Sequence, residues 1–183
     1  MRVQRFSEHL AMPWANGKGA SYEILSDRDA LNQWSWRVAI APVVVDGPFS
    51  SLPRVDRQLV VIDGNGMVLE VDGKTVECLP SQVVAFSGDA TAYARLIDGP
   101  SVDLGLMTAR DVFAGSMSVV VGVGSVIESD LIVAIGDSVL EDESGVHHGL
   151  QTKDALLDVQ RRRMVLRKGN AIAIRVDSFV KSR

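Results

Sequence analysis

A glycine-rich stretch near the N-terminus contains residue types that suit a small-molecule binding loop. Residues 13–24 read PWANGKGASYEI and place Trp14, Asn16, Gly17 and Gly19 close together. An asparagine amide both donates and accepts hydrogen bonds, and glycine lets the backbone approach a ligand closely. A tryptophan ring can form one wall of a pocket. The alternative interpretation is an ordinary tight turn, because Asn-Gly is a common turn pair.

Two arginines are the candidate cationic groups. Residues 34–43 read WSWRVAIAPV, and their alternation predicts a strand with the two tryptophans on an apolar face and small residues around Arg37 on the other. The face with Arg37 is either exposed to solvent or lines a hollow with one cation. Arg57 precedes a predicted buried strand. It is either a second cationic donor to a carboxylate or half of a surface ion pair with Asp56 or Glu70.

Two carboxylates, Glu23 and Asp103, complete the set of candidate ligand-binding residues. They are also the groups to which general acid–base catalysis would fall if the protein were a metal-independent enzyme acting on a small carboxylate.

The histidines and the cysteine do not match a catalytic pattern. A cupin-type metal site needs several histidines and a carboxylate converging inside one barrel. Here His147 and His148 are adjacent and would point to opposite faces of a strand, and His9 is distant in sequence. Cys78 has no histidine nearby and is interpreted as a small buried apolar residue. The glycine patterns of phosphate-binding loops do not occur either, so we expect no catalytic residue, no metal and no cofactor.

The overall composition is that of a soluble globular protein. The 183 residues are 46% hydrophobic and 23% charged, with a net charge of −4, which argues against disorder and against a nucleic-acid surface. No apolar run is long enough to span a bilayer, and the N-terminus lacks the apolar core of a signal peptide. A single cysteine fits a reducing compartment. We therefore expect a cytoplasmic protein without nucleic-acid or membrane partners.

Short strands must position these residues. Runs of Val, Ile and Leu are closed by Asp-Gly, Asn-Gly and Gly-Pro pairs, as is typical of strands and hairpins. The clearest hairpin is MVLEVDGKTVECL, residues 67–79, with a type I′ turn at Asp72-Gly73. Only residues 152–163 offer a helical alternative. The chain is predicted to be nearly all β, with strands over residues 59–62, 68–71, 76–79, 83–86, 92–97, 119–123, 131–135 and 171–176.

The two halves of the chain also resemble each other. Stretches with similar strand patterns recur at an interval of roughly 70 residues, which exceeds the period of solenoid repeats. In this alignment Gly64 matches Gly136, and Leu96 matches Leu166. Two fused copies of a small β-barrel would explain the repeat. We expect an N-terminal unit over residues 1–110 and a C-terminal unit over residues 111–183, packed as one body.

Four stretches together resemble the HutD/Ves family of bicupin proteins. PWANGKGASYEI is followed by WSWRVAIAPVVVDGPFSSLPRVDRQLVVIDGNGMVL, then by VVAFSGD and by VDLGLMTAR, in the order and spacing typical of the family. The resemblance is dense over residues 12–110, and beyond them only the internal repeat supports it. It implies two fused cupin barrels that have lost the usual metal-binding histidines. It also implies an association with bacterial histidine utilisation.

The sequence departs from the family pattern at three positions. The family usually has lysine where this chain has Ala15, glycine where it has Lys18, and asparagine where it has Gly105. Either Lys18 restores the lost positive charge three residues later, or the ligand differs. These departures bear on the identity of the ligand more than on the fold.

The residues and the resemblance together predict non-enzymatic binding of a small carboxylate metabolite, with a regulatory or buffering role in the metabolism of histidine and glutamate derivatives. In this hypothesis Trp14–Gly19 forms the rim of the N-terminal barrel's mouth, and Arg37 and Arg57 bind the carboxylate. The alternatives are a metal-independent enzyme and a protein-interaction module. Cupin-type barrels pair through edge strands, so a homodimer is a candidate assembly.

Overall fold

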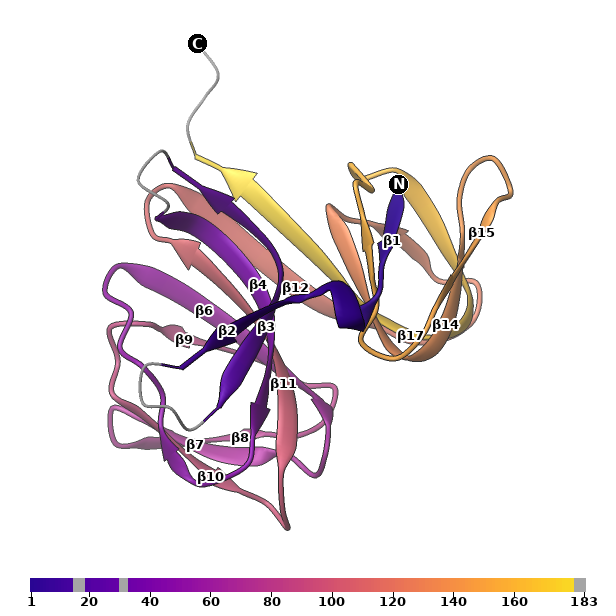
Figure 1. Ribbon diagram of the computed structural model, residues 1–183. Coiled ribbons are helices and arrows are strands. Elements are labelled where there is room, and N and C mark those ends of the chain that lie inside the picture. Colours follow the sequence, from indigo (N-terminus) through magenta and orange to yellow (C-terminus); the bar gives the residue numbers. More distant parts are fainter. Residues whose placement is uncertain (15–18, 30–32, 180–183) are drawn as a thin grey trace. The chain divides into compact units, whose positions relative to one another are not determined.

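The computed structural model describes residues 1–14, 19–29 and 33–179. These residues form strands and one short 3-10 helix, η1 (Phe6–Glu8), and they contain no α-helix (Figure 1). None of the described helical structure has the length and apolar character needed to cross a membrane. The prediction of a nearly all-β protein is confirmed, and the helical alternative at residues 152–163 is wrong because that segment contains strand β16 (Ala155–Leu157).

The chain divides into two compact units. Unit 1 contains Met1–His9 and Ser116–Val176, and unit 2 contains Leu10–Gly115 together with the segment that begins at Asp177. The two repeated barrels predicted from the sequence are not confirmed, because the strand order of neither unit closes on itself in the described part of the chain. The bicupin arrangement therefore stays a prediction.

Unit 2 consists of two antiparallel sheets. The six-stranded sheet has the order β2-β3-β4-β11-β6-β9, and the four-stranded sheet has the order β5-β10-β7-β8. The bounds of the first are β2 (Leu10–Pro13), β3 (Ala20–Arg28), β4 (Trp34–Val43), β11 (Ser101–Ala109), β6 (Val55–Asp63) and β9 (Val83–Ser87). Those of the second are β5 (Gly47–Pro48), β10 (Ala92–Leu96), β7 (Met67–Val71) and β8 (Lys74–Cys78).

Alternating apolar residues hold these two sheets together. Leu59 and Val61 of β6 pack with Met67 and Leu69 of β7 and with Cys78 of β8 in one buried cluster. Burial of such side chains is the main source of stability for a β-sandwich of this size. The β7–β8 hairpin forms as predicted, with positive φ angles of 46° and 75° at its two turn residues, Asp72 and Gly73.

Unit 1 is built around a seven-stranded sheet. Its main order is β1-β16-β14-β17-β12, with β13 paired to β17 and β15 paired to β14. The bounds are β1 (Arg2–Gln4), β14 (Leu131–Glu141), β17 (Arg163–Ser178), β12 (Phe113–Val120), β13 (Val126–Glu128) and β15 (His147–Leu150). The predicted strand over residues 119–123 ends earlier, at Val120, because Gly122 and Gly124 take the positive φ angles of a turn.

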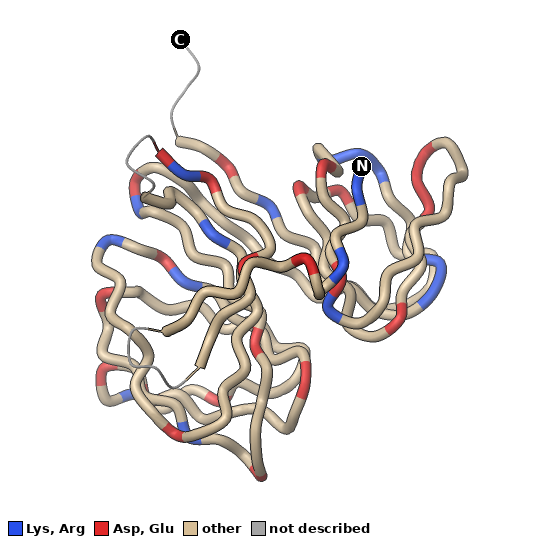
Figure 2. Tube along the Cα trace, viewed as in Figure 1, with Lys and Arg blue, Asp and Glu red and all other residues tan. Residues whose placement is uncertain are grey.

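The core of unit 1 is mainly apolar. Its buried cluster includes Ile132, Leu140, Leu156, Met164 and Leu166, all fully buried. Charged residues of both signs are interspersed along the trace of each unit (Figure 2). In unit 2, the buried charged side chains include Glu23 and Asp103 of the larger sheet.

Candidate functional site

Strand register places both candidate arginines on one face of the six-stranded sheet. Arg37 of β4 lies opposite Met107 of β11, and Met107 lies opposite Arg57 of β6. Residues directly opposite each other in an antiparallel pair project to the same side. The same side of β6 carries Leu59 and Val61, which belong to the core between the two sheets. The arginines therefore lie on the inner face, and the solvent-exposed alternative for the Arg37 face is wrong.

The neighbouring positions on this face are small or acidic. Gly105 of β11 lies opposite Ala39 of β4, and Asp103 lies opposite Ala41. The other face of β4 is buried at Val38 and Ile40, as predicted, and both side chains are completely inaccessible, whereas Trp34 and Trp36 on the same predicted face are only half-buried. The face therefore combines small residues, Gly105, Ala39 and Ala41, with the apolar side chains of Met107 and Leu59.

Glu23 is held in this face by two arginines and a serine. Arg37 Nε lies 3.0 Å from Glu23 Oε2, Arg28 Nη2 donates to both carboxylate oxygens at 3.0 and 2.8 Å, and Ser26 Oγ donates to Oε1 at 2.8 Å. The Glu23 side chain is only 8% exposed. Burial alone would raise its pKa, but the hydrogen bonds from Arg28 and Ser26 and the two positive charges outweigh it and lower the pKa. Glu23 is therefore a stable anion.

Arg37 retains unused hydrogen-bonding capacity. Its side chain is 16% exposed, and its Nε is buried without a hydrogen-bond partner, because the contact with Glu23 is close but poorly aligned. Burial lowers the pKa of Arg37, the charge of Glu23 offsets part of that effect, and the charge of Arg28 adds to it. A buried guanidinium N–H without an acceptor is costly, so this position favours an additional acceptor.

Arg57 packs against two aromatic rings. Its guanidinium carbon lies 4.9 Å from the ring centroids of both Phe49 and Phe86, and Nη1 donates to the carbonyl of Ser50 at 3.1 Å. The two rings pack edge-to-face, with centroids 6.3 Å apart, and each contributes a cation–π contact to the guanidinium. Burial lowers the pKa of Arg57, and the nearby charge of Asp103 offsets part of that effect.

The surface ion pair considered for Arg57 does not form. Asp56 instead accepts from Arg110 at 2.8 Å, and Glu70 pairs with Arg95 at 3.5 Å.

Asp103 is the most deeply buried charged residue of this face. It is 4% exposed, and its Oδ2 has no hydrogen-bond partner. Burial raises its pKa to about 7, and the charge of Arg57 offsets part of that rise. Cys78 of β8 is fully buried, and burial together with the charge of Asp103 raises the pKa of its thiol to about 12. A thiol in this environment is inert, and the prediction that Cys78 is a buried apolar residue is confirmed.

The glycine-rich stretch is described only at its two ends. The backbone N–H of Trp14 donates to the carbonyl of Gly19 at 2.8 Å, and its indole N–H donates to Ser21 Oγ at 2.9 Å. A Cβ on Gly19 would come within 2.9 Å of the Trp14 ring, so glycine is needed for this packing. Asn16 and Gly17 lie outside the described residues, and the role of this stretch as a rim stays a prediction.

Sequence reasoning missed several residues of the site. For Arg28 the sequence gives only a weak signal, a charged residue at the end of a strand with alternating polarity. No local pattern links Phe49 and Phe86 to Arg57, because they come from a loop and from β9 and meet it only in the fold. The pairing of Arg57 with Phe86 in the β6–β9 ladder supplies half of this arrangement.

The histidines occupy separate positions. In unit 1, His147 Nε2 lies 2.9 Å from Glu141 Oε2, and His148 Nε2 lies 3.0 Å from Asp142 Oδ2. His9 is buried, and its ring packs edge-on against Phe6. Among the described residues, no three His, Cys, Asp or Glu side chains are grouped so that they could hold a metal ion.

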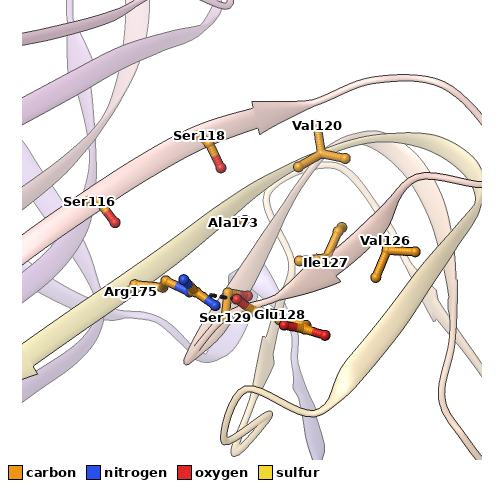
Figure 3. Close-up of a pocket in the computed structure, with 9 residues that line it drawn as sticks. All are labelled: Ser116, Ser118, Val120, Val126, Ile127, Glu128, Ser129, Ala173 and Arg175. Carbon is orange, nitrogen blue, oxygen red and sulfur yellow. Dashed lines mark hydrogen bonds between the residues drawn. The ribbon is translucent and has the colours of Figure 1, made fainter.

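A concavity of about 480 Å³ lies in unit 1 along β12, β13 and β17 (Figure 3). Arg175 Nε donates to the carbonyl of Glu128 at 2.7 Å, and the buried Ser129 hydroxyl donates to the carbonyl of Leu131 at 3.1 Å. Its remaining hydroxyl groups belong to exposed serines. This concavity is a weaker candidate than the inner face of unit 2, where buried donors and acceptors remain unpaired.

Sequence comparison finds relatives of this chain among known proteins. The chain is 34% identical over 111 residues to an uncharacterised 21.2 kDa protein in the hutC 3′ region of Pseudomonas putida, covering 60% of this chain and 58% of that protein. It is 36% identical over 100 residues to protein Ves of Citrobacter koseri, covering 54% and 52%. The chain thus spans little more than half the length of these curated relatives.

Solved structures extend the similarity to nearly the whole chain. A conserved protein of unknown function from Pseudomonas aeruginosa PAO1 superposes with a TM-score of 0.84 at 28% identity, covering 97% of this chain and 98% of that one. HutD from Pseudomonas fluorescens SBW25, in a formate condition, gives 0.83 at 28% identity, with 98% and 99% covered. A cupin 2 conserved barrel domain protein from Leptotrichia buccalis gives 0.57 at 8% identity, covering 96% of each chain, which shows that the fold is cupin-like.

The match to the model of the HutD family covers residues 6–174. This range includes every described residue of the charged inner face, from Glu23 to Asp103. The chain therefore belongs to the HutD family.

Proposed function

We propose that the inner face of the six-stranded sheet binds a small organic carboxylate, and that the protein senses or buffers this metabolite without converting it. The observation that carries the proposal is the pair of interior arginines, Arg37 and Arg57, on either side of Met107. An interior arginine with unpaired N–H groups beside small residues suits a carboxylate, which accepts two hydrogen bonds from a planar guanidinium.

The names of two relatives support a link to the hut locus and do not specify a ligand. One relative is encoded in the hutC 3′ region, and one structural relative is HutD in a formate condition. A link to the metabolism of histidine and glutamate derivatives is consistent with these names. Charge-assisted hydrogen bonds contribute about 1.5–3 kcal/mol each, and two of them with one or two neutral bonds give a dissociation constant in the range of roughly millimolar to micromolar. That range suits reversible sensing of an abundant metabolite.

Calorimetric titration tests the proposal. Formate, acetate, glutamate and N-acetylglutamate are expected to bind, and the corresponding amides are expected not to bind. Arg57→Gln and Arg37→Gln should each weaken binding by about 10- to 100-fold. Arg95→Gln is the matched control, because Arg95 lies on the same unit in an exposed ion pair with Glu70. Unchanged binding in both site variants would rule out the proposed face.

One observation favours a second candidate, a metal-independent enzyme. A carboxyl group with a pKa of about 7, as at Asp103, is suited to general acid–base catalysis at neutral pH. Glu23 is not, because its lowered pKa makes it a weak base. In this case Asp103→Asn would abolish turnover of a carboxylate substrate while Glu23→Gln would retain part of it. Absence of turnover for every ligand that binds would exclude the enzyme.

A further inference from the structure

The carboxyl group of Asp103 is not satisfied by the protein alone. It is 4% exposed, and its Oδ2 is buried without a hydrogen-bond partner. An ionised oxygen in that position would lose its hydrogen bonds with water and gain none from the protein, which is strongly unfavourable. A protonated carboxyl group loses far less hydration free energy on burial. Its O–H can also donate a hydrogen bond to an anion placed beside it.

The charged groups around Asp103 do not neutralise it directly. Arg57 faces it from β6, and the un-ionised thiol of Cys78 faces it from β8. On β4 and β3 the inner face carries Arg37 and Glu23, which pair with each other. Within the described chain, no hydrogen bond or ion pair joins Arg57 to Asp103. The two groups are close enough to influence each other and too far apart to touch.

The position between them has no side chain. On the inner face of β11, Gly105 stands midway between Asp103 and Met107, the residue opposite Arg57. A Cβ at Gly105 would meet nothing closer than Asp103 Oδ1 and the Met107 methyl group, both at 3.8 Å. Glycine is therefore not required for packing here. Its effect is that β11 adds no side chain of its own between the guanidinium and the carboxyl group.

We propose that the ligand carboxylate binds over Gly105 between Arg57 and Asp103, and that Asp103 is protonated in the complex and donates its O–H to the ligand. This inference rests on the proposed carboxylate site and adds a rule for its regulation. Binding at alkaline pH must bring one proton from the buffer onto Asp103, whereas binding at acidic pH uses a proton that is already there. No covalent bond in the ligand is broken.

The direction of the pH effect follows from electrostatics. The pKa of Asp103 is about 7 in the free protein, and an anion next to it raises that value further because two adjacent carboxylates cannot both ionise easily. Above pH 7 the affinity should therefore fall, approaching tenfold for each pH unit. Below pH 7 it should be constant, since the ligand carboxyl itself titrates near pH 4.

Calorimetry with sodium formate on the full chain tests the inference. Titrations at pH 6, 7, 8 and 9, in pairs of buffers with different ionisation enthalpies, give both the dissociation constant and the protons taken up. The expected result is a constant affinity up to about pH 7, a progressive loss above it, and uptake rising toward one proton per formate. Asp103→Asn should flatten the pH profile and remove the proton uptake, whatever its absolute affinity. Asp98→Asn, at an exposed turn, is the matched control and should keep the wild-type profile.

The outcomes separate this inference from the function on which it rests. Formate binding without proton uptake, or binding that strengthens as pH rises, overturns the role of Asp103 and leaves the carboxylate site standing. If Asp103→Asn keeps the wild-type dependence of formate affinity on pH, the role of Asp103 is likewise overturned and the carboxylate site still stands. If that variant does not fold or does not bind, the proton uptake of the wild-type protein decides alone. Absence of formate binding at every pH overturns both proposals.

Discussion

Arg37 and Glu23 form an ion pair on neighbouring strands, with Arg37 Nε 3.0 Å from Glu23 Oε2, on the face of the sheet that the fold turns inward. Both side chains are largely withdrawn from solvent, and Arg28 adds a second positive charge to the same carboxylate. Two cations around one anion leave a net positive charge. The pair is thus both a structural element and a source of positive potential for the site.

Glu23→Gln should destabilise the protein. The substitution removes the charge that compensates Arg37 and Arg28, and it leaves guanidinium N–H groups poorly satisfied. The expected loss in the free energy of unfolding is about 1–3 kcal/mol. Urea denaturation followed by tryptophan fluorescence measures it. Glu70→Gln removes the exposed partner of Arg95 and should cost less than about 1 kcal/mol. Equal losses in the two variants would contradict a structural role for the Glu23 cluster.

Gly105→Ala should separate binding from stability. The new methyl group has room, so the free energy of unfolding should be unchanged or rise by about 0.4–1 kcal/mol through the unfolded state. The methyl group occupies the position proposed for the ligand carboxylate, so the dissociation constant for N-acetylglutamate should increase. Gly64→Ala is the contrasting variant, because φ is +87° there and a Cβ would collide with the Pro100 carbonyl, and it should be strongly destabilising. Undiminished binding in Gly105→Ala would exclude a ligand over this glycine.

His9 should make the protein less stable at mildly acidic pH. Both ring nitrogens are buried without hydrogen bonds. Burial lowers the pKa of His9 in the folded protein, and the charges of Asp154 and Glu8 offset only part of that effect. Because the unfolded chain then binds a proton more readily, stability falls as pH decreases below about 6.5. Denaturation midpoints at pH 7.5 and 5.5 should differ more for the wild type than for His9→Leu. The same difference in both would exclude His9 as the cause.

Cys78 should be unreactive in the folded protein. The thiol is fully buried and its pKa is raised to about 12, so neither access nor ionisation favours alkylation. Reaction with a thiol reagent at pH 8 should be at least about 100-fold slower without denaturant than in 6 M guanidinium, because it requires opening of the structure. Fast labelling of the native protein would show that the core around β8 is open to solvent.

The sequence was sufficient for the elements with strong local patterns. The hairpin at Met67–Cys78 formed as predicted because alternation and the Asp72-Gly73 turn agree at every position. The buried face of β4 followed from the alternation of Trp34–Ile40. The family resemblance, dense over residues 12–110, was confirmed by a match that covers residues 6–174.

Local patterns were insufficient where strands depart from regular alternation. A register irregularity in the β3–β4 ladder, between Glu23 and Leu25, shifts the alternation so that Ser26 comes opposite Arg37. Glu23, Ser26 and Arg28 therefore meet although their spacing is not that of one strand face. A bulge of this kind depends on the partner strand, and the sequence of β3 does not contain that information.

By itself, the sequence determined the all-β class, the family and the identity of the charged residues, because composition, turn pairs and motif order are properties of the chain read locally. Only the tertiary structure decided that Arg37, Arg57, Glu23 and Asp103 share the interior face of one sheet, and that Asp103 is left without a hydrogen-bond partner at Oδ2. The physical reason is that burial and pairing depend on strands distant in sequence, whose register and packing no local pattern specifies.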